Sequence, residues 1–121
     1  LHMVDNTYIK YSNKDYNISK LVKKLEKHGV NIFHCSELKA GSELFNSSKS
    51  LIEIVRSVTK KTIISCGNIL EQKQIKKISK FGANLMAFGR MSMVYPDLVL
   101  RYKNKKKLNR KFTYEKWEKY N

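Results

Sequence analysis

Segments with helical spacing of apolar residues alternate with short, nearly continuous apolar runs between residues 17 and 103. The short runs are 30–36, 61–66 and 83–89. The stretches HGVNIFHCS and FGANLMAFG share one form, in which a helix-ending glycine precedes a strand. Helices that alternate with strands predict a parallel sheet with helical crossovers. The chain is therefore expected to form either an open doubly wound sheet or part of a (β/α)8 barrel.

The ends of these elements are predicted from caps and breakers. A helix from residue 17 is expected to end at Gly29, and one over 46–58 to start with Ser47 or Ser48 as its N-cap. A third helix over 70–82 ends at a glycine, and a fourth begins at Pro96. The run 61–66 is typical of a strand covered on both faces. Residues 1–5 suggest the end of an earlier strand, 6–17 a polar loop, and 112–120 a further short helix.

The length of 121 residues predicts one modest domain, and 41% hydrophobic residues are enough for a core. No apolar run is long enough for a membrane span, and the first residues lack the pattern of a signal peptide. The spacing of Cys35 and Cys66 matches neither a zinc site nor a disulfide framework. We therefore expect reduced core thiols in a cytoplasmic protein, with no metal site.

The chain carries a formal net charge of +15, and residues 101–121 hold nine basic and two acidic residues. Such a charge is compatible with a polyanionic partner. The lysines are spread along the whole chain, however, and charge alone carries no sequence specificity. A solvated, lysine-rich surface is the simpler interpretation, and nucleic acid is not the expected partner.

Glycines follow two of the predicted strands. The two segments are Cys66-Gly67-Asn68 and Phe88-Gly89-Arg90. In parallel α/β folds, ligands bind at the carboxyl ends of the strands, and a glycine there lets the backbone approach a ligand. The free N–H groups at the start of the helix that follows the strand favour an anion, and the planar guanidinium of an arginine, which is always charged, can bind one. The two segments predict a phosphate site, although glycines at strand ends are also common turn residues.

Residues 62–103 resemble the C-terminal part of the old yellow enzyme family, the FMN-dependent NADH:flavin oxidoreductases and ene-reductases. That family has a glycine after strand 7, a Gly-Ala-Asp start of strand 8, a Gly-Arg at its end, and then Asn/Asp-Pro-Asp-Leu. The matching residues are Gly67, Gly82-Ala83-Asn84, Gly89-Arg90 and Tyr95-Pro96-Asp97-Leu98. Residues 21–36 resemble the family's helix 5 and strand 6, so the resemblance covers about residues 17–103.

The resemblance implies a role for each site residue. Gly67 and Gly89 would give backbone N–H groups to the FMN phosphate, and Arg90 would contact the phosphate or the flavin. Cys66, Asn68 and Phe88 would line the pocket. NAD(P)H would be the co-substrate, with hydride passing through FMN to an acceptor such as an activated alkene. The family's catalytic residues come from earlier strands, so none is assigned here. Asn31 and Asn84 stand where the family has aspartates.

A complete barrel needs about 250 residues. The resemblance therefore implies strands 5–8 only, with residues 1–103 as a partial FMN-binding TIM-barrel domain and 104–121 as a basic tail. Open strand edges predict that the chain self-associates or pairs with a missing N-terminal barrel half. A membrane is not an expected partner. Two alternatives remain: a barrel segment that binds a phosphorylated metabolite, and a basic module that binds nucleic acid.

Overall fold

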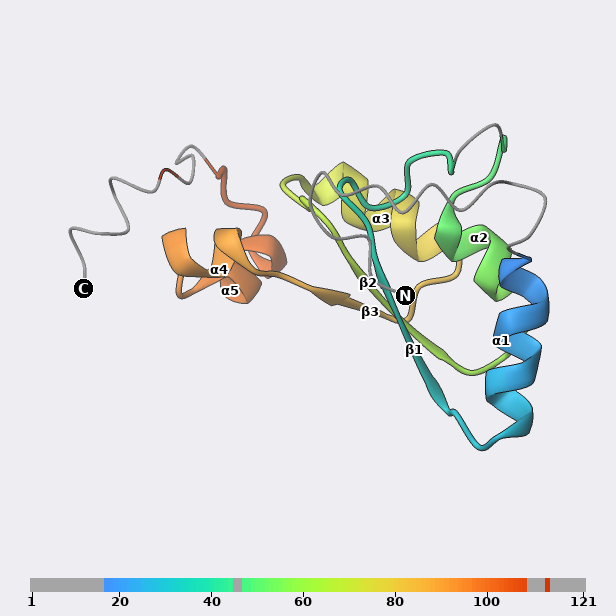
Figure 1. Cartoon of the computed structure of the whole chain (residues 1–121). Coiled ribbons are helices and arrows are strands. Elements are labelled where there is room, and N and C mark those ends of the chain that lie inside the picture. The colour runs from blue at the N-terminus through green and yellow to red at the C-terminus, as the bar shows by residue number, and fades with distance from the viewer. Residues whose placement is uncertain (1–16, 45–46, 109–112, 114–121) are drawn as a thin grey trace.

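The chain folds into a three-stranded parallel sheet whose strands alternate with helices (Figure 1). A computed structural model describes residues 17–44, 47–108 and 113. The strands β1 (Ile32–Ser36), β2 (Thr62–Cys66) and β3 (Leu85–Ala87) lie in the order β1-β2-β3. Both pairings are parallel. The predicted α/β alternation is therefore confirmed within this part of the chain.

Helix α1 (Ile18–Lys27) forms as its sequence predicts. The Asn17 side chain accepts a hydrogen bond from the backbone N–H of Lys20 at 3.0 Å, which caps the first turn. At the other end, Gly29 takes a φ of +91°, a left-handed conformation that glycine adopts without strain. Val22 is fully buried on the face that meets the sheet. Amphipathic spacing and both caps thus agree on one helix.

Helix α2 (Leu51–Arg56) starts later than predicted, and the N-cap is Ser50 rather than Ser47 or Ser48. The Ser50 hydroxyl accepts from the backbone N–H of Glu53, and the Glu53 carboxylate accepts from the backbone N–H of Ser50. This capping box satisfies two N–H groups at once, which a lone serine cap does not. Residues 43 and 50 also form an isolated antiparallel bridge, and the backbone of Ser50 itself is extended, so the helix starts only after this residue.

Helix α3 (Gln72–Lys80) lies within the predicted range, and Gly82 follows it with a φ of +109°. The predicted helix at Pro96 begins two residues later, as α5 (Leu98–Lys103), with Asp97 as its N-cap. Between β3 and α5 lies a separate short helix, α4 (Arg90–Val94). The strand expected over 1–5 and the helix expected over 112–120 fall outside the described residues, apart from residue 113.

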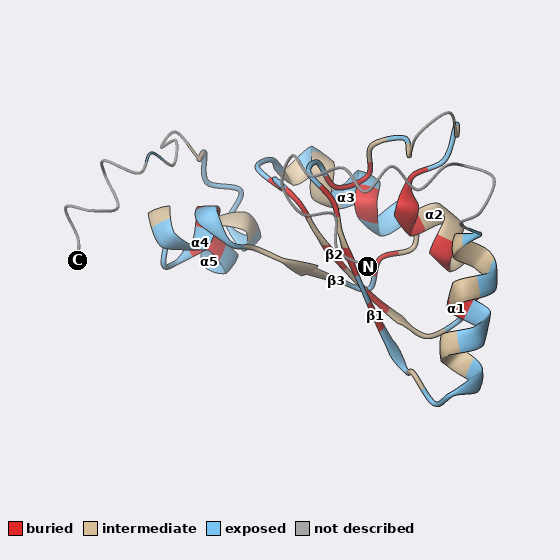
Figure 2. Ribbon diagram, viewed as in Figure 1, coloured by how far each residue is buried: buried red, intermediate tan, exposed pale blue. Residues whose placement is uncertain are grey.

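The helices α1, α2 and α3 lie on the same side of the sheet, as Figure 1 shows. Buried residues gather where these helices meet the strands (Figure 2). Phe33 and Cys35 of β1 and Ile63 of β2 belong to this main core. The opposite face carries Ile32, which is 57% exposed, and Leu85, which is 54% exposed. In the run 61–66, which was expected to be covered on both faces, Ile63 and Ser65 are buried but Thr62, Ile64 and Cys66 are only half-buried, so the second face is covered incompletely.

A second, smaller core joins α4 and α5. Its buried members are Met91, Tyr95 and Leu98. Phe88 packs against both cores, and its ring centroid lies 5.5 Å from that of Tyr102 in α5. Phe88 therefore connects the α4–α5 unit to the main core.

Arg56 joins the end of α2 to the start of β3. Its guanidinium donates to the carbonyl oxygen of Gly82 from Nε at 3.0 Å and from Nη2 at 2.8 Å. Nη2 also donates to Asn84 Oδ1 at 2.6 Å, and the same Oδ1 accepts from the backbone N–H of Ile63 at 2.9 Å. The side-chain oxygen of Asn84 thus links α2, β2 and the start of β3.

Candidate anion-binding edge of the sheet

The two predicted glycine segments leave neighbouring strands at the same edge of the sheet. Cys66, the last residue of β2, is paired with Ala87, the last residue of β3. Gly67 and Phe88 therefore follow their strands side by side, and Asn68 and Gly89 come next. The two strand ends therefore lie next to each other, as a shared phosphate site requires, and the phosphate site itself stays a prediction.

Gly67 is required by the packing of the protein backbone itself. Its φ is +139°, and a Cβ at this position would collide with the carbonyl oxygen of Glu37. The backbone N–H of Ala40 donates to the Gly67 carbonyl at 2.8 Å, and that of Glu37 donates to the Cys66 carbonyl at 2.9 Å. The loop after β1 therefore occupies the space that the sequence interpretation reserved for a ligand.

Asn68 lies in the left-handed region at φ +41°, which asparagine tolerates better than most residues. The side chain of Gln74 holds this loop. Its Nε2 donates to the Asn68 carbonyl at 3.3 Å, and its Oε1 accepts from the backbone N–H of Leu70 at 3.1 Å. The sequence interpretation did not single out Gln74, because an exposed-looking glutamine in a lysine-rich helix gives no such signal.

Gly89 and Arg90 have open surroundings. A Cβ on Gly89 would meet nothing within 4 Å. Arg90 is exposed, and its guanidinium forms no hydrogen bond or ion pair with residues 17–44 or 47–108. Ser92 Oγ donates to the Gly89 carbonyl at 2.6 Å and so steadies the first turn of α4. This strand end thus presents a cation beside open space.

The remaining predicted residues are placed differently. Cys66 is half-buried and lies on the uncovered face, in register with Ser36 of β1. Phe88 serves as the connection between the two cores. Asp97, part of the family-like segment, accepts from Arg101 Nε at 2.7 Å, and this hydrogen bond lowers the carboxyl pKa. Arg101 in turn lies 4.7 Å from the Tyr95 ring centroid. The Pro-Asp-Leu segment therefore has a structural role in starting α5.

Glu37 is a buried acid at this edge that the sequence interpretation missed. It directly follows β1, and its Oε2 accepts from the backbone N–H of Gly41 at 3.2 Å. Burial raises the pKa of this carboxyl, while hydrogen bonds from the backbone of Gly41 and Leu51 oppose the rise. An acidic residue directly after an apolar strand is the signal that could have identified it.

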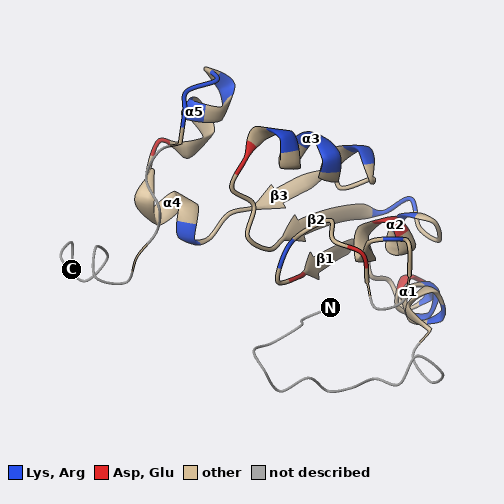
Figure 3. Ribbon diagram, turned by 90° about the horizontal axis from the view of Figure 1, so that it is seen from above, with Lys and Arg blue, Asp and Glu red and all other residues tan. Residues whose placement is uncertain are grey.

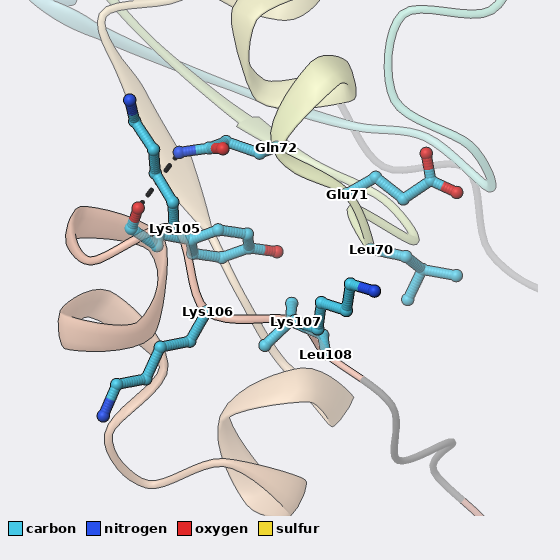
Figure 4. A pocket seen from close by; sticks show the side chains of 8 residues that line it. Leu70, Glu71, Gln72, Lys105, Lys106, Lys107 and Leu108 are labelled. Atoms are coloured by element: carbon cyan, nitrogen blue, oxygen red, sulfur yellow. Dashed lines mark hydrogen bonds between the residues drawn. The ribbon is translucent and has the colours of Figure 1, made fainter.

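A pocket of about 200 Å³ lies away from this edge, between the start of α3 and the end of α5 (Figure 4). Gln72 Nε2 donates to the Tyr102 carbonyl at 3.0 Å across it. Lys106 points away from Glu71, whereas Lys107 lies toward it, so the lysine side chains do not converge (Figure 4). None of the six predicted site residues lines this pocket, whose lining is Leu70, Glu71, Gln72, Tyr102, Lys105, Lys106, Lys107 and Leu108.

The described residues also bear on metals and membranes. No group of three or more His, Cys, Asp or Glu side chains among them is arranged to hold a metal ion. None of the helices in residues 17–44 and 47–108 has the length and apolar character needed to cross a bilayer.

Comparison with models of known protein families and with curated proteins gives no match to this chain. The edge of the sheet is therefore interpreted from its own geometry, together with the sequence resemblance.

Proposed function

We propose that this chain holds the phosphate of FMN as the C-terminal part of a (β/α)8-barrel oxidoreductase of the old yellow enzyme type. The observation that carries the proposal is the parallel pairing of Cys66 with Ala87. This pairing brings the Gly67-Asn68 and Gly89-Arg90 segments to one edge, where parallel α/β folds bind phosphates. The parallel strands and their helical crossovers are compatible with barrel units.

The residues fit a phosphate unequally. Gly89 and Arg90 fit well, because open space adjoins the glycine and the guanidinium is unengaged within the described chain. Gly67 fits less well, because the Glu37 carbonyl occupies the space beside its Cα. We therefore assign the principal anion contact to Arg90 and the backbone at Gly89. Gly67 and Asn68 shape the adjoining loop.

The chemistry of such an enzyme is hydride transfer from NAD(P)H to an acceptor, and bound FMN would supply it. The chain's own contribution is narrower. Arg90 would neutralise phosphate charge through charge-assisted hydrogen bonds, and the strands would fix the distance between the two loops. No catalytic residue is assigned to this chain, in keeping with the resemblance to the C-terminal part of the family alone.

A titration of the purified chain with FMN, followed by flavin fluorescence, tests the proposal. We expect Arg90→Ala to weaken binding by about tenfold or more, as for the loss of one charge-assisted hydrogen bond. Lys76→Ala is the matched control, because it removes one exposed positive charge from α3, away from this edge. Equal losses in both variants would indicate general electrostatic attraction and refute the assignment.

A phosphorylated metabolite is the second candidate, because the described edge contains features suited to phosphate and none specific to a flavin ring. Competition separates the two ligands. If riboflavin, which lacks the phosphate, competes with FMN, the ring is recognised. If inorganic phosphate and a sugar phosphate displace FMN and riboflavin does not, the metabolite alternative is favoured.

A further inference from the structure

Gln74 is a polar side chain of α3 that faces the loops at the carboxyl ends of the strands. The lysines of this helix are exposed and are distributed along its length (Figure 3). Gln74 is half-buried instead, in the first turn of the helix. A neutral amide suits this place, because it donates and accepts at once, whereas a lysine only donates and a carboxylate only accepts.

The amide of Gln74 links the loops that follow two neighbouring strands. Its Nε2 donates to the carbonyl oxygen of Asn68 at 3.3 Å and to that of Ala40 at 3.5 Å. Its Oε1 accepts from the backbone N–H of Leu70 at 3.1 Å. Asn68 and Leu70 belong to the loop after β2, whereas Ala40 belongs to the loop after β1. One side chain therefore fixes the two loops relative to each other.

The loop after β1 is a firm support for this link. Ala40 is only 4% exposed. Next to it, the backbone N–H of Gly41 donates to Glu37 Oε2 at 3.2 Å. A Cβ on Gly41 would lie 3.3 Å from Cγ1 of Ile78 in α3, so the loop packs closely against this helix. The loop after β2 is thus tied to a part of the molecule that is already well packed.

The carbonyl groups held in this way set the direction of two backbone N–H groups. The C=O and N–H of a planar trans peptide point in opposite directions, and the described chain contains no cis peptide bond. The Gly67 carbonyl accepts from the N–H of Ala40 at 2.8 Å, so the N–H of Asn68 points away from the loop after β1. The Asn68 carbonyl accepts from Gln74, so the N–H of Ile69 points away from that side chain.

These two N–H groups are available to an acceptor. Neither the N–H of Asn68 nor that of Ile69 donates a hydrogen bond within residues 17–44 and 47–108. Ile69 is only 4% exposed, and backbone N–H groups of buried residues are nearly always hydrogen-bonded. Because β2 lies between β1 and β3, the direction away from β1 is the side of Gly89 and Arg90.

We propose that Gln74 is a positioning residue of the anion site. It holds the loop after β2 in the shape that turns the N–H groups of Asn68 and Ile69 toward an anion at Arg90. Asn68 has a left-handed φ of +41°, and successive N–H groups in such a turn form a concavity that attracts anions. This inference rests on the anion site proposed above and adds the residue that shapes its second half.

Loss of the amide should allow the loop to leave this shape for part of the time. Only the fraction of molecules with the loop in place offers both N–H groups, so the apparent dissociation constant rises as that fraction falls. Gln74→Met keeps the length of the side chain but removes its three hydrogen bonds. We expect the affinity for phosphate to fall by about tenfold.

Titration of the labelled chain with inorganic phosphate, followed by proton–nitrogen correlation NMR, tests the inference. In the unmodified chain we expect the amide resonances of Asn68 and Ile69 to shift together with that of Arg90. In Gln74→Met the shifts of Asn68 and Ile69 at saturating phosphate should shrink, whereas Arg90 should still respond. A side chain that only stabilised the fold would leave this pattern unchanged in the molecules that remain folded.

Asn31→Leu is the matched control, because it also removes a side-chain amide that holds the backbone. Asn31 Nδ2 donates to the Gly29 carbonyl at 3.2 Å, just before β1 and thus at the opposite end of the sheet. Thermal unfolding compares the stability of both variants. We expect Asn31→Leu to lose stability and to keep its affinity for phosphate. An equal loss of affinity in the two variants would overturn the inference.

The remaining outcomes separate this inference from the anion site itself. Full shifts of Asn68 and Ile69 with unchanged affinity in Gln74→Met would overturn the positioning role. Shifts of Arg90 without those of Asn68 and Ile69 in the unmodified chain would also overturn it, but would leave the anion site in place. No response at any of these residues would overturn both proposals.

A second variant serves if circular dichroism shows that Gln74→Met does not fold. Gln74→Glu keeps the shape of the side chain and the acceptor for the Leu70 N–H, and at neutral pH it loses only the two donated hydrogen bonds. We expect the same reduced shifts of Asn68 and Ile69 at saturating phosphate. Shifts as large as in the unmodified chain would overturn the positioning role.

Discussion

Replacing Asn84 by aspartate should stabilise the fold through Arg56. Asn84 Oδ1 already accepts from Arg56 Nη2 at 2.6 Å and from the backbone N–H of Ile63 at 2.9 Å. Aspartate has the same shape and keeps this acceptor. It also adds a negative charge facing a guanidinium that two further carbonyls hold in place.

The magnitude follows from the difference between charged and neutral hydrogen bonds, about 1 kcal/mol. Asn84 is exposed, so solvent screening reduces the gain to about 0.5 kcal/mol. For a chain of this size that gain raises Tm by about 2 °C. Arg56 would hold the pKa of the new carboxyl below its unfolded value of about 3.9. The gain is then present above pH 4 and is lost as the pH falls through the folded-state pKa.

Thermal and urea unfolding at pH 7 and pH 3 measure this effect. Asn31→Asp is the matched control at the other strand start. The Asn31 side chain donates to the Gly29 carbonyl at 3.2 Å, and a carboxylate cannot donate there. We expect no gain, or a loss, for Asn31→Asp. A stability increase in Asn84→Asp that persists unchanged at pH 3, or no increase at pH 7, would refute the reasoning.

Three further predictions follow from the strand-end edge. Gly67→Ala should destabilise the fold by about 2 kcal/mol or more, because the added Cβ meets the Glu37 backbone. Gly89→Ala should cost less than about 1 kcal/mol, because a Cβ there meets nothing within 4 Å. Urea unfolding compares the two variants. Burial raises the pKa of Glu37 in the folded state. The protonated acid therefore favours folding at low pH, and this contribution is lost as the pH rises through the unfolded-state pKa and then the folded-state pKa. Glu37→Gln should therefore reduce the loss of stability that sets in as the pH rises above the unfolded pKa of about 4.3, and an unchanged pH profile would contradict this. Cys66 should react with a thiol reagent in the folded chain before Cys35, whose pKa burial raises to about 11; mass spectrometry of the modified peptides decides the order.

Much of the fold could be predicted from periodicity and glycine positions. The alternation of α1, β1, α2, β2, α3 and β3 follows the apolar spacing, because each element buries a stripe or a face. The cap of α2 was misplaced, although the Ser50 to Glu53 spacing of a capping box was present in the sequence. Three nearby serines all have suitable chemistry, and only the extended conformation of Ser50, which is bridged to Glu43, selects among them.

The one-sided covering of the sheet was not predictable from residue types. Ile32, Ile64 and Leu85 read as core residues, since an apolar side chain looks the same in sequence whether a neighbour covers it or not. Only part of the candidate site was predictable, because residue types do not show which distant segments pack together. Adjacency of the two strand ends follows from topology, but Gly67 is required by the approach of a loop distant in sequence.

Phe88 has a consequence for how the anion site would be measured. The unit that carries Arg90 is tied to the main core through this aromatic ring and through the hydrogen bond from Gln72 to Tyr102. A unit held in this way opens locally at lower free energy than the core. Only the closed fraction would present both halves of the site, so the apparent dissociation constant is the intrinsic one divided by that fraction. Substitutions of the Phe88 ring should therefore weaken anion binding, and bound anion should slow amide hydrogen exchange in α4 and α5.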